Sequence, residues 1–352
     1  MRVGGRLCFL VWALGHSPCL VIGRLERAIL LSRHGQRESL TKHHTTLHES
    51  GLIDEGGPRL TRSGLGQLQR VGKVFHNLYF APTCQNSSCL AGHGSLNEED
   101  IHAESTGLAR TLSTAAAVLQ TLALSEATIA LPQPVYSRLE SNDFLLRGYA
   151  GGKCAALADG IQRLLVSSAF AAMSANSTEL REEVGALLLS LNAANRTELV
   201  IEPKSGRAAV ALRDWWNAWD VLANTQPPLL SESSMMSAER LIAWLEGHKF
   251  GTSSQGWLCG GALATEVLRR LAAPLDRQRL VYYSAHYPTL LCLLGALGIS
   301  IDSGEASDHW LREEMIPPAS VLAFELHSTP TVGEGVSYHV QLWLLNGDEV
   351  PL

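Results

Sequence analysis

The feature that most constrains this chain is an apolar segment that ends in a short basic run. Residues 28–31 read Ala-Ile-Leu-Leu, a pattern typical of a buried strand. Arg33, His34 and Arg37 follow almost directly, and Gly35 permits a tight turn between them. Two guanidinium groups offer forked donors to a dianion, and a neutral imidazole beside them can attack phosphorus. The run therefore indicates phosphate chemistry, and its alternative interpretation is a surface turn with scattered charges.

A second apolar segment also ends in a histidine. Residues 280–284 predict a strand, His286 follows it, and residues 288–297 predict a helix with proline in its first turn. Ligands of alternating α/β folds collect beyond the carboxyl ends of strands, so His34 and His286 are expected at one rim. The positive end of the helix would point at the same place and favour a bound phosphate.

The alternation of strands and helices predicts an α/β fold. We expect a doubly wound, mostly parallel sheet with helices on both faces. The remaining predicted segments are helices over residues 64–80 and 263–271, a helix from Ser105 or Thr106 to residue 119, a polar loop over 81–103, and final strands over 321–326 and 338–345.

Residues 125–255 differ from this pattern, because they are mainly helical and variable in character. Candidate helices there cover residues 155–172, 179–193 and 238–245. Three tryptophans are interpreted as packing beneath a cap rather than as a binding platform: Trp215, Trp216 and Trp219. We therefore expect a core of residues 24–124 and 256–352, with residues 125–255 inserted as a helical cap that overhangs the site.

Several motifs accompany the basic run in a fixed order. They resemble the motifs of the histidine acid phosphatases, a branch of the histidine phosphatase superfamily. The matching segments are Arg33-His34-Gly35-Gln36-Arg37, Leu60-Thr61-Arg62-Ser63-Gly64 with Gln67 and Gly72, Glu104-Ser105-Thr106 with Arg110, Thr111 and Ser113, Gly260-Gly261-Ala262-Leu263, Tyr283-Ser284-Ala285-His286, and Pro318-Ala319-Ser320. They extend from about residue 28 to the late strands, whereas residues 125–255 match only loosely.

The resemblance implies an acid phosphatase, a hydrolase of phosphate monoesters that works through a covalent phosphohistidine. It implies that His34 is the nucleophile and that Arg33, Arg37 and Arg110 hold phosphate oxygens. His286 is implied as the second catalytic histidine, which also binds phosphate. Three cations spread over the equatorial oxygens would stabilise the charge of a transferring phosphoryl group.

One position departs from the family's pattern. The family places an acid, usually aspartate, directly after the second histidine, where this chain has Tyr287. With an ordinary pKa of about 10, a tyrosine donates a proton to a leaving alcohol less readily than a carboxylic acid does. Three readings stay open: another carboxylate such as Glu38 is the donor, good leaving groups need no donor, or phosphate esters are bound without turnover. We predict an active acid phosphatase, and the alternative is a non-catalytic or weakly active phosphate-ester binding protein.

Composition limits the partners. The chain has 28 basic and 34 acidic residues, a net charge of −6, and no basic stripe, so nucleic acid is not expected. Small phosphate monoesters or phosphorylated biomolecules are the expected partners, and no oligomeric state is indicated. No cofactor or metal is expected either. His43, His44 and His48 include an i, i+4 pair, but without framing carboxylates or cysteines a polar loop is favoured.

The first residues predict export. Residues 1–23 resemble a secretory signal peptide, with two early arginines before a short apolar core over residues 7–14. Three sequons, at Asn86, Asn176 and Asn195, fit a glycoprotein. We expect the protein to be secreted or held in a lysosomal or vacuolar lumen, without a membrane span.

The cysteines predict a disulfide but not its pairing. Two of the seven lie in the predicted signal peptide, which leaves five. Cys84 and Cys89 flank a polar loop and could close a local bridge. Cys154 and Cys259 are another possible pair, while Cys292 lies in an apolar run and is interpreted as a core residue.

Overall fold

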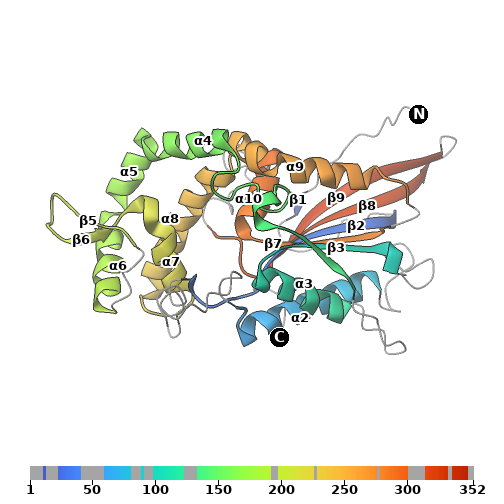
Figure 1. Ribbon diagram of the computed structural model, residues 1–352, viewed down its shortest axis with the longest axis horizontal. Helices are drawn as coiled ribbons and strands as arrows, with labels where there is room; N and C mark the ends of the chain where they lie inside the picture. Colours follow the sequence, from blue (N-terminus) through green and yellow to red (C-terminus); the bar gives the residue numbers. More distant parts are fainter. Residues whose placement is uncertain are drawn as a thin grey trace.

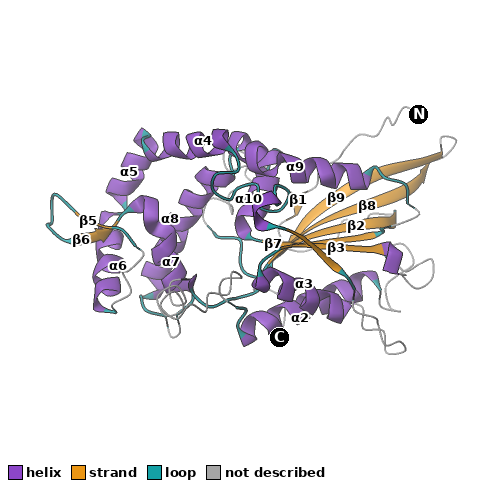
Figure 2. Ribbon diagram, in the orientation of Figure 1, coloured by secondary structure: helices purple, strands orange, loops and turns teal. Residues whose placement is uncertain are grey.

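The computed structural model combines a β-sheet that carries helices on both faces with a lobe made mainly of helices (Figures 1 and 2). It describes residues 11–12, 23–40, 59–80, 89–90, 98–122, 133–191, 197–225, 228–275, 278–299, 314–331 and 335–347. The predicted α/β fold with a helical cap is therefore confirmed.

The main sheet has the strand order β1-β9-β8-β2-β7-β3-β4. Its strands are β1 (Val11–Trp12), β2 (Arg24–Arg33), β3 (Ile101–Thr106), β4 (Val135–Arg138), β7 (Leu280–Ala285), β8 (Val321–Thr331) and β9 (Gly335–Leu345). Strands β2, β7, β3 and β4 pair in parallel, as β1 does with β9, whereas β8 is antiparallel to both β2 and β9. The sheet is thus mixed, with an antiparallel hairpin beside its parallel half. Strand β1 lies within the predicted signal peptide, which stays a prediction.

Strand β2 is buried on both faces because helices cover each side of the sheet. Its side chains alternate: Ile29 and Leu31 belong to one apolar core, and Ala28 and Leu30 to the other. One face carries α2 (Arg62–Tyr79) and α3 (Ala109–Leu122), and the other carries α9 (Ser253–Leu271) and α10 (Tyr287–Ala296) (Figure 1). A strand enclosed in this way needs a continuous apolar run, which is the pattern seen in the sequence.

Strand β3 corrects the prediction of a loop that extends to residue 103. It lies between β7 and β4, and the helix after it starts at Ala109 rather than at Ser105 or Thr106. The strand reads Ile-His-Ala-Glu-Ser-Thr, and its polar residues from Glu104 onward are buried. Their partners come from other segments: the Glu104 carboxylate, for example, pairs with Arg138 of β4 at 2.7 Å. When the polar side chains of a buried strand bond to distant partners, its sequence lacks the periodic pattern of apolar residues by which strands are predicted.

Helices α9 and α10 pack with their backbones unusually close. A Cβ atom on Gly260 would lie 2.2 Å from the carbonyl oxygen of Cys292. At the same contact a disulfide joins Cys259 to Cys292. Two expectations are therefore wrong: Cys259 does not pair with Cys154, which is a free thiol, and Cys292 is bonded rather than only packed.

Part of the evidence for export lies in the described residues. Cys89 is disulfide-bonded, but its expected partner Cys84 lies outside them, so that pairing stays a prediction. Asn176 is exposed at the end of its helix, whereas Asn86 and Asn195 lie outside the described part. Within this part, no helix combines the length and apolar character needed to cross a bilayer.

The second lobe holds most of the predicted insertion. It contains α4 (Ala155–Leu165), α5 (Ser168–Asn176), α6 (Thr178–Ser190), α7 (Trp215–Ala223), α8 (Glu232–Phe250) and the short hairpin of β5 (Leu199–Ile201) and β6 (Ala208–Val210). The helix predicted over 155–172 is split, because Ser167 caps a new helix through the amide of Phe170. Strand β4 also falls within residues 125–255 but belongs to the main sheet, so the helical lobe begins after it.

Candidate active site

The basic run lies immediately beyond the end of β2 and is held by its backbone. The amides of Arg33 and His34 donate to the carbonyls of Ser320 and Ala285, at 2.8 and 3.1 Å. The His34 carbonyl accepts from the amide of Ala319 at 3.0 Å. Ala319 adopts a left-handed conformation, with φ of 62°, that is costly for alanine. The late Pro-Ala-Ser motif thus serves as a backbone support for the histidine.

A glycine contact and a glutamine fix the turn against α2. A Cβ atom on Gly35 would lie 2.6 Å from the carbonyl oxygen of Gly64, and one on Gly64 would lie 2.0 Å from that of Gln36. The side chain of Gln67 accepts from the amide of Gln36 at 2.9 Å. The Leu-Thr-x-x-Gly-x-x-Gln segment therefore holds the basic turn, and Thr61 within it caps α2.

His34 is a neutral imidazole with one defined free nitrogen. It is buried, and its Nδ1 lies 2.8 Å from the carbonyl oxygen of Gly35. A carbonyl can only accept, so Nδ1 carries the hydrogen and Nε2 keeps its lone pair. Burial lowers the pKa of His34 well below its usual value, and the positive charges of Arg110, Arg33 and Arg37 lower it further. A neutral imidazole with a free lone pair can act as a nucleophile.

His286 lies beside His34, as the pattern of two strand ends predicts. The two ring centroids are 5.4 Å apart, and the rings meet edge to face. The Nε2 atom of His286 is 3.1 Å from the hydroxyl of Thr106, at the end of β3. Burial lowers the pKa of His286 well below its usual value, and the positive charge of Arg110 adds to this effect. His286 also caps α10, so a helix N-terminus begins at the site.

The three predicted arginines surround this pair. Arg110 lies in the first turn of α3, and burial together with the charge of Arg37 lowers its pKa to about 10. The guanidinium of Arg33 donates to the carbonyl of Ile316 and lies 5.3 Å from the ring centroid of Tyr287. The structure thus gathers His34, His286 and all three arginines from three segments of the chain: the basic run after β2, the start of α3 and the end of β7.

Tyr287 contacts the cap and is not among the described residues that line the pocket. Its hydroxyl donates to the carboxylate of Glu246 on α8, and its ring meets Trp216 edge to face at 5.8 Å. Burial raises the pKa of Tyr287 well above 10, and the neighbouring Glu246 raises it further. Glu246 is itself buried and paired with Lys249 at 2.9 Å. Glu38, the carboxylate considered as a substitute, is exposed and is not among the described residues that line the pocket.

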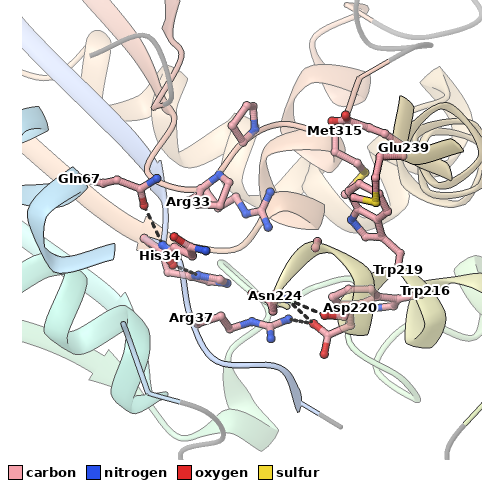
Figure 3. A pocket seen from close by; sticks show the side chains of 16 residues that line it. Arg33, His34, Arg37, Gln67, Trp216, Trp219, Asp220, Asn224, Glu239 and Met315 are labelled. Carbon is pink, nitrogen blue, oxygen red and sulfur yellow. Dashed lines mark hydrogen bonds and ion pairs between the residues drawn. The ribbon is translucent and has the colours of Figure 1, made fainter. Parts of the chain in front are cut away.

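A pocket of about 300 Å³ opens beside His34 (Figure 3). The basic turn forms one wall, and α7, α8 and residues 315–318 form the others. Its described lining residues are Arg33, His34, Gly35, Gln36, Arg37, Gln67, Trp216, Trp219, Asp220, Ala223, Asn224, Met235, Glu239, Met315, Pro317 and Pro318. Trp215 is wholly buried, whereas Trp216 and Trp219 pack against the same core and also line the pocket, so the interpretation as packing is incomplete for these two.

Sequence reasoning missed several residues at this site. Asp220 binds Arg37 at 2.6 Å, and Tyr149 places its ring 6.3 Å from that of His286. Burial raises the pKa of Tyr149 to about 12, and the charge of Arg147 contributes to the lowered pKa of His286. All three missed residues lie within 125–255, where the motifs match loosely, so only the tertiary contact identifies them.

Metal binding finds no support in the described part of the chain. No group of three or more histidine, cysteine, aspartate and glutamate side chains there could hold an ion. His43, His44 and His48 lie outside it.

Known proteins resemble this chain in sequence. It is 29% identical to the testicular acid phosphatase of Mus musculus, in a match that covers 98% of this chain and 77% of the relative. It is 25% identical to the lysosomal acid phosphatase of Bos taurus, over 85% of this chain and 66% of the relative. Over most of its length the chain therefore resembles acid phosphatases, which supports the likeness of its motifs to those of the histidine acid phosphatases. No family model matches the chain.

Solved structures share the fold of this chain. The phytase of Citrobacter braakii superposes with a TM-score of 0.58 at 17% identity, covering 91% of this chain and 84% of the phytase. The multiple inositol polyphosphate phosphatase of Bifidobacterium longum, in complex with inositol hexasulfate, gives a TM-score of 0.57 at 13% identity, covering 96% and 89%. Identities this low establish the fold alone, and it is the likeness to acid phosphatases in sequence that supports phosphatase activity.

Proposed function

We propose that this phosphatase hydrolyses phosphate monoesters through a covalent phosphohistidine on His34. The observation that carries the proposal is the free Nε2 of a buried, neutral His34 among three arginines. In the first step Nε2 attacks phosphorus, the phosphorus–oxygen bond of the ester breaks, and the alcohol leaves. Water then attacks the phosphohistidine, which releases inorganic phosphate and restores the imidazole.

The surrounding cations suit this transfer. Arg33, Arg37 and Arg110 would bind the equatorial oxygens, where charge is spread in the transition state. The proposed role of His286 is to donate a hydrogen bond to phosphate, with its N-terminal helix position adding a favourable field. These assignments rest on the geometry and on the family's motifs.

The open question is how the leaving alcohol gains its proton. The contacts of Tyr287 favour the alternative in which good leaving groups need no proton donor. A buried tyrosine with a raised pKa, bonded to Glu246, is a poor acid for an alcohol. Glu38 is exposed and outside the described pocket wall, which weakens its case as the donor. We infer that the enzyme prefers esters whose alcohol leaves without protonation, such as aryl phosphates, and Trp216 and Trp219 offer an aromatic wall for them.

The first prediction tests the nucleophile. The His34→Ala variant should lose hydrolysis of p-nitrophenyl phosphate at acidic pH while its circular dichroism and melting temperature stay close to wild type. Rapid quenching of the wild type with labelled substrate should trap a protein-bound phosphate that is labile in acid and stable in alkali. Most of the activity surviving in His34→Ala would refute the mechanism. A wild type that binds phosphate without turnover would favour the alternative, a phosphate-ester binding protein.

We further propose that residues 125–255 act as a cap over the site.

We also propose that the protein enters the secretory pathway. The predicted signal peptide, the exposed sequon at Asn176 and three disulfide-bonded cysteines among the described residues support export. Expression with residues 1–23 intact, followed by N-terminal sequencing and glycosidase treatment, tests it.

A further inference from the structure

The cap contributes a buried carboxylate to the phosphate site. Asp220, on α7, is only 2% exposed. It accepts hydrogen bonds from Arg37 at 2.6 Å, from the hydroxyl of Ser39 at 2.8 Å and from the amide of Leu40 at 2.7 Å. Asn224, one turn further along α7, donates to the same carboxylate at 3.4 Å. The Asp220 carboxylate is therefore hydrogen-bonded both to Arg37 of the basic run and to the two residues, Ser39 and Leu40, that follow this run.

A second residue of α7 contacts the same arginine. Trp216 precedes Asp220 by four positions, so the two side chains share one face of the helix. The guanidinium carbon of Arg37 lies 5.7 Å from the ring centroid of Trp216. Arg37 is itself buried, and Figure 3 shows its guanidinium directed at Asp220 across the pocket. One helix of the cap thus makes two contacts with Arg37: an ion pair through Asp220 and a cation–π contact through Trp216.

We propose that Asp220 is a positioning residue, by which the cap orients Arg37 for binding phosphate. The inference rests on the proposed function and extends it, since it makes phosphate affinity a property of the cap as well as of the core. An arginine side chain has many rotamers, and a buried partner that selects one removes the cost of ordering it when phosphate binds. Ser39 and Leu40 fix the carboxylate in turn, so Arg37 is held from a rigid support.

Two effects of Asp220 on phosphate have opposite signs. Its negative charge repels a dianion in the pocket, so removal of the charge alone would tighten phosphate binding. Its hydrogen bonds orient Arg37, so their loss would weaken binding and slow transfer. The direction of the change in phosphate affinity therefore separates a positioning role from a purely electrostatic one.

The test is the Asp220→Asn variant, which keeps the shape of the side chain, removes its charge and replaces one of the two accepting oxygens with an NH2 group that cannot accept a hydrogen bond. Positioning predicts that the inhibition constants of phosphate and vanadate rise about tenfold and that kcat/KM for p-nitrophenyl phosphate falls by up to about 10²-fold. Tighter or unchanged phosphate binding would overturn the proposal. Calorimetric binding of inorganic phosphate needs no turnover, so this arm decides the inference even if the protein proves only to bind phosphate.

A matched control separates positioning from loosening of the cap. Glu202 pairs at 2.7 Å with Arg181, a cap arginine whose side chain is only 2% exposed. Glu202→Gln removes the carboxylate of an equally short ion pair to a buried arginine, away from the site. We expect Glu202→Gln to lower the melting temperature without changing phosphate affinity. Equal loss of phosphate affinity in Glu202→Gln and Asp220→Asn would assign the effect to general loosening and refute the proposal.

A double-mutant cycle tests whether Asp220 acts through Arg37. On the background of Arg37→Ala, Asp220→Asn should cause no further loss of phosphate affinity, because the group that it positions is gone. A full additional loss on that background would show that Asp220 acts by another route. If Arg37→Ala does not fold, the direction of the change in Asp220→Asn still decides the proposal.

Discussion

At the scale of single residues, Tyr287 shows how one substitution changes the chemistry that a family site can perform. The position follows the second histidine, where the family places its acid, but the hydroxyl donates to Glu246 on α8. Its ring also lies against Arg33, at 5.3 Å from the guanidinium carbon. Where the family places its acid, this chain thus has a residue that links the core to the cap.

The second prediction is that a carboxylic acid at this position restores protonation of poor leaving groups. Tyr287→Asp should raise kcat/KM for an alkyl phosphate at acidic pH by up to about 10²-fold, and change that for p-nitrophenyl phosphate much less. The reason is that an alkoxide needs a proton as its bond to phosphorus breaks, whereas nitrophenolate does not.

Two variants serve as controls for this experiment. Tyr287→Phe removes only the hydroxyl, so it should affect both substrates alike. Fast alkyl phosphate hydrolysis by the wild type that is lost in Glu38→Gln would instead identify Glu38 as the donor. An equal loss of both activities in Tyr287→Asp would mean that the tyrosine is needed only for structure.

At the scale of elements, the contact between α9 and α10 explains why the Gly-Gly-x-Leu motif contains glycines. Gly260 faces the backbone of α10, where a Cβ atom would lie 2.2 Å from the carbonyl oxygen of Cys292. Gly261, the next residue, faces the ring of Trp257 at 3.4 Å, an ordinary contact. Helix α10 begins at the active-site histidine, so this close packing also locates His286.

The third prediction is that these adjacent glycines respond to alanine with opposite signs. Gly260→Ala should lower the free energy of unfolding by about 1–3 kcal/mol, because the backbones must separate. Gly261→Ala should raise it by up to about 1 kcal/mol, because alanine has the higher helix propensity and its Cβ fits. Urea denaturation of both variants measures the difference. Equal stability changes would mean that the backbone contact is not tight.

At the scale of the whole molecule, two buried histidines make stability depend on pH. Burial and nearby positive charge lower the pKa of both His34 and His286 in the folded state. In the unfolded chain their pKa returns to about 6.5, so the unfolded state binds more protons below that pH. The stabilisation is complete above about pH 6.5 and is lost as the pH falls toward the lowered folded-state values.

The fourth prediction follows from this difference in proton binding. Between about pH 6.5 and 5, the free energy of unfolding should fall with pH by up to about 1.4 kcal/mol per pH unit for each histidine. Paired carboxylates contribute only at lower pH: Arg269 and Arg270 keep the pKa of Glu266 at about 2, and an unfolded glutamate titrates near about 4.3. Urea denaturation at several pH values, in wild type and His34→Asn, measures the slope. The variant should show the smaller slope, and an identical slope would contradict the assignment.

The sequence by itself determined the α/β core and the expected pair of active-site histidines. A strand buried on both faces must be apolar throughout, so β2 and β7 were visible, and the histidines that follow them were expected at one rim. The basic run and His286 were found because each directly follows such a strand. Arg110 was found by its motif, although the strand before it was missed. That strand, β3, is largely polar, and partners from other segments satisfy its polar side chains, so it shows no apolar pattern in the sequence.

Only the tertiary structure decided what the cap contributes. Asp220 lies 183 positions from Arg37 and Glu246 lies 41 from Tyr287, and neither helix carries a periodic signal for these contacts. The Cys259–Cys292 disulfide likewise depends on the approach of two helices, which spacing along the chain does not encode. Local periodicity reflects which face of an element is buried, whereas a pairing between distant polar groups depends on where packing brings them together. The phosphate chemistry proposed for His34 was therefore readable from its neighbours in sequence, whereas the carboxylates that contact Arg37 and Tyr287 were not.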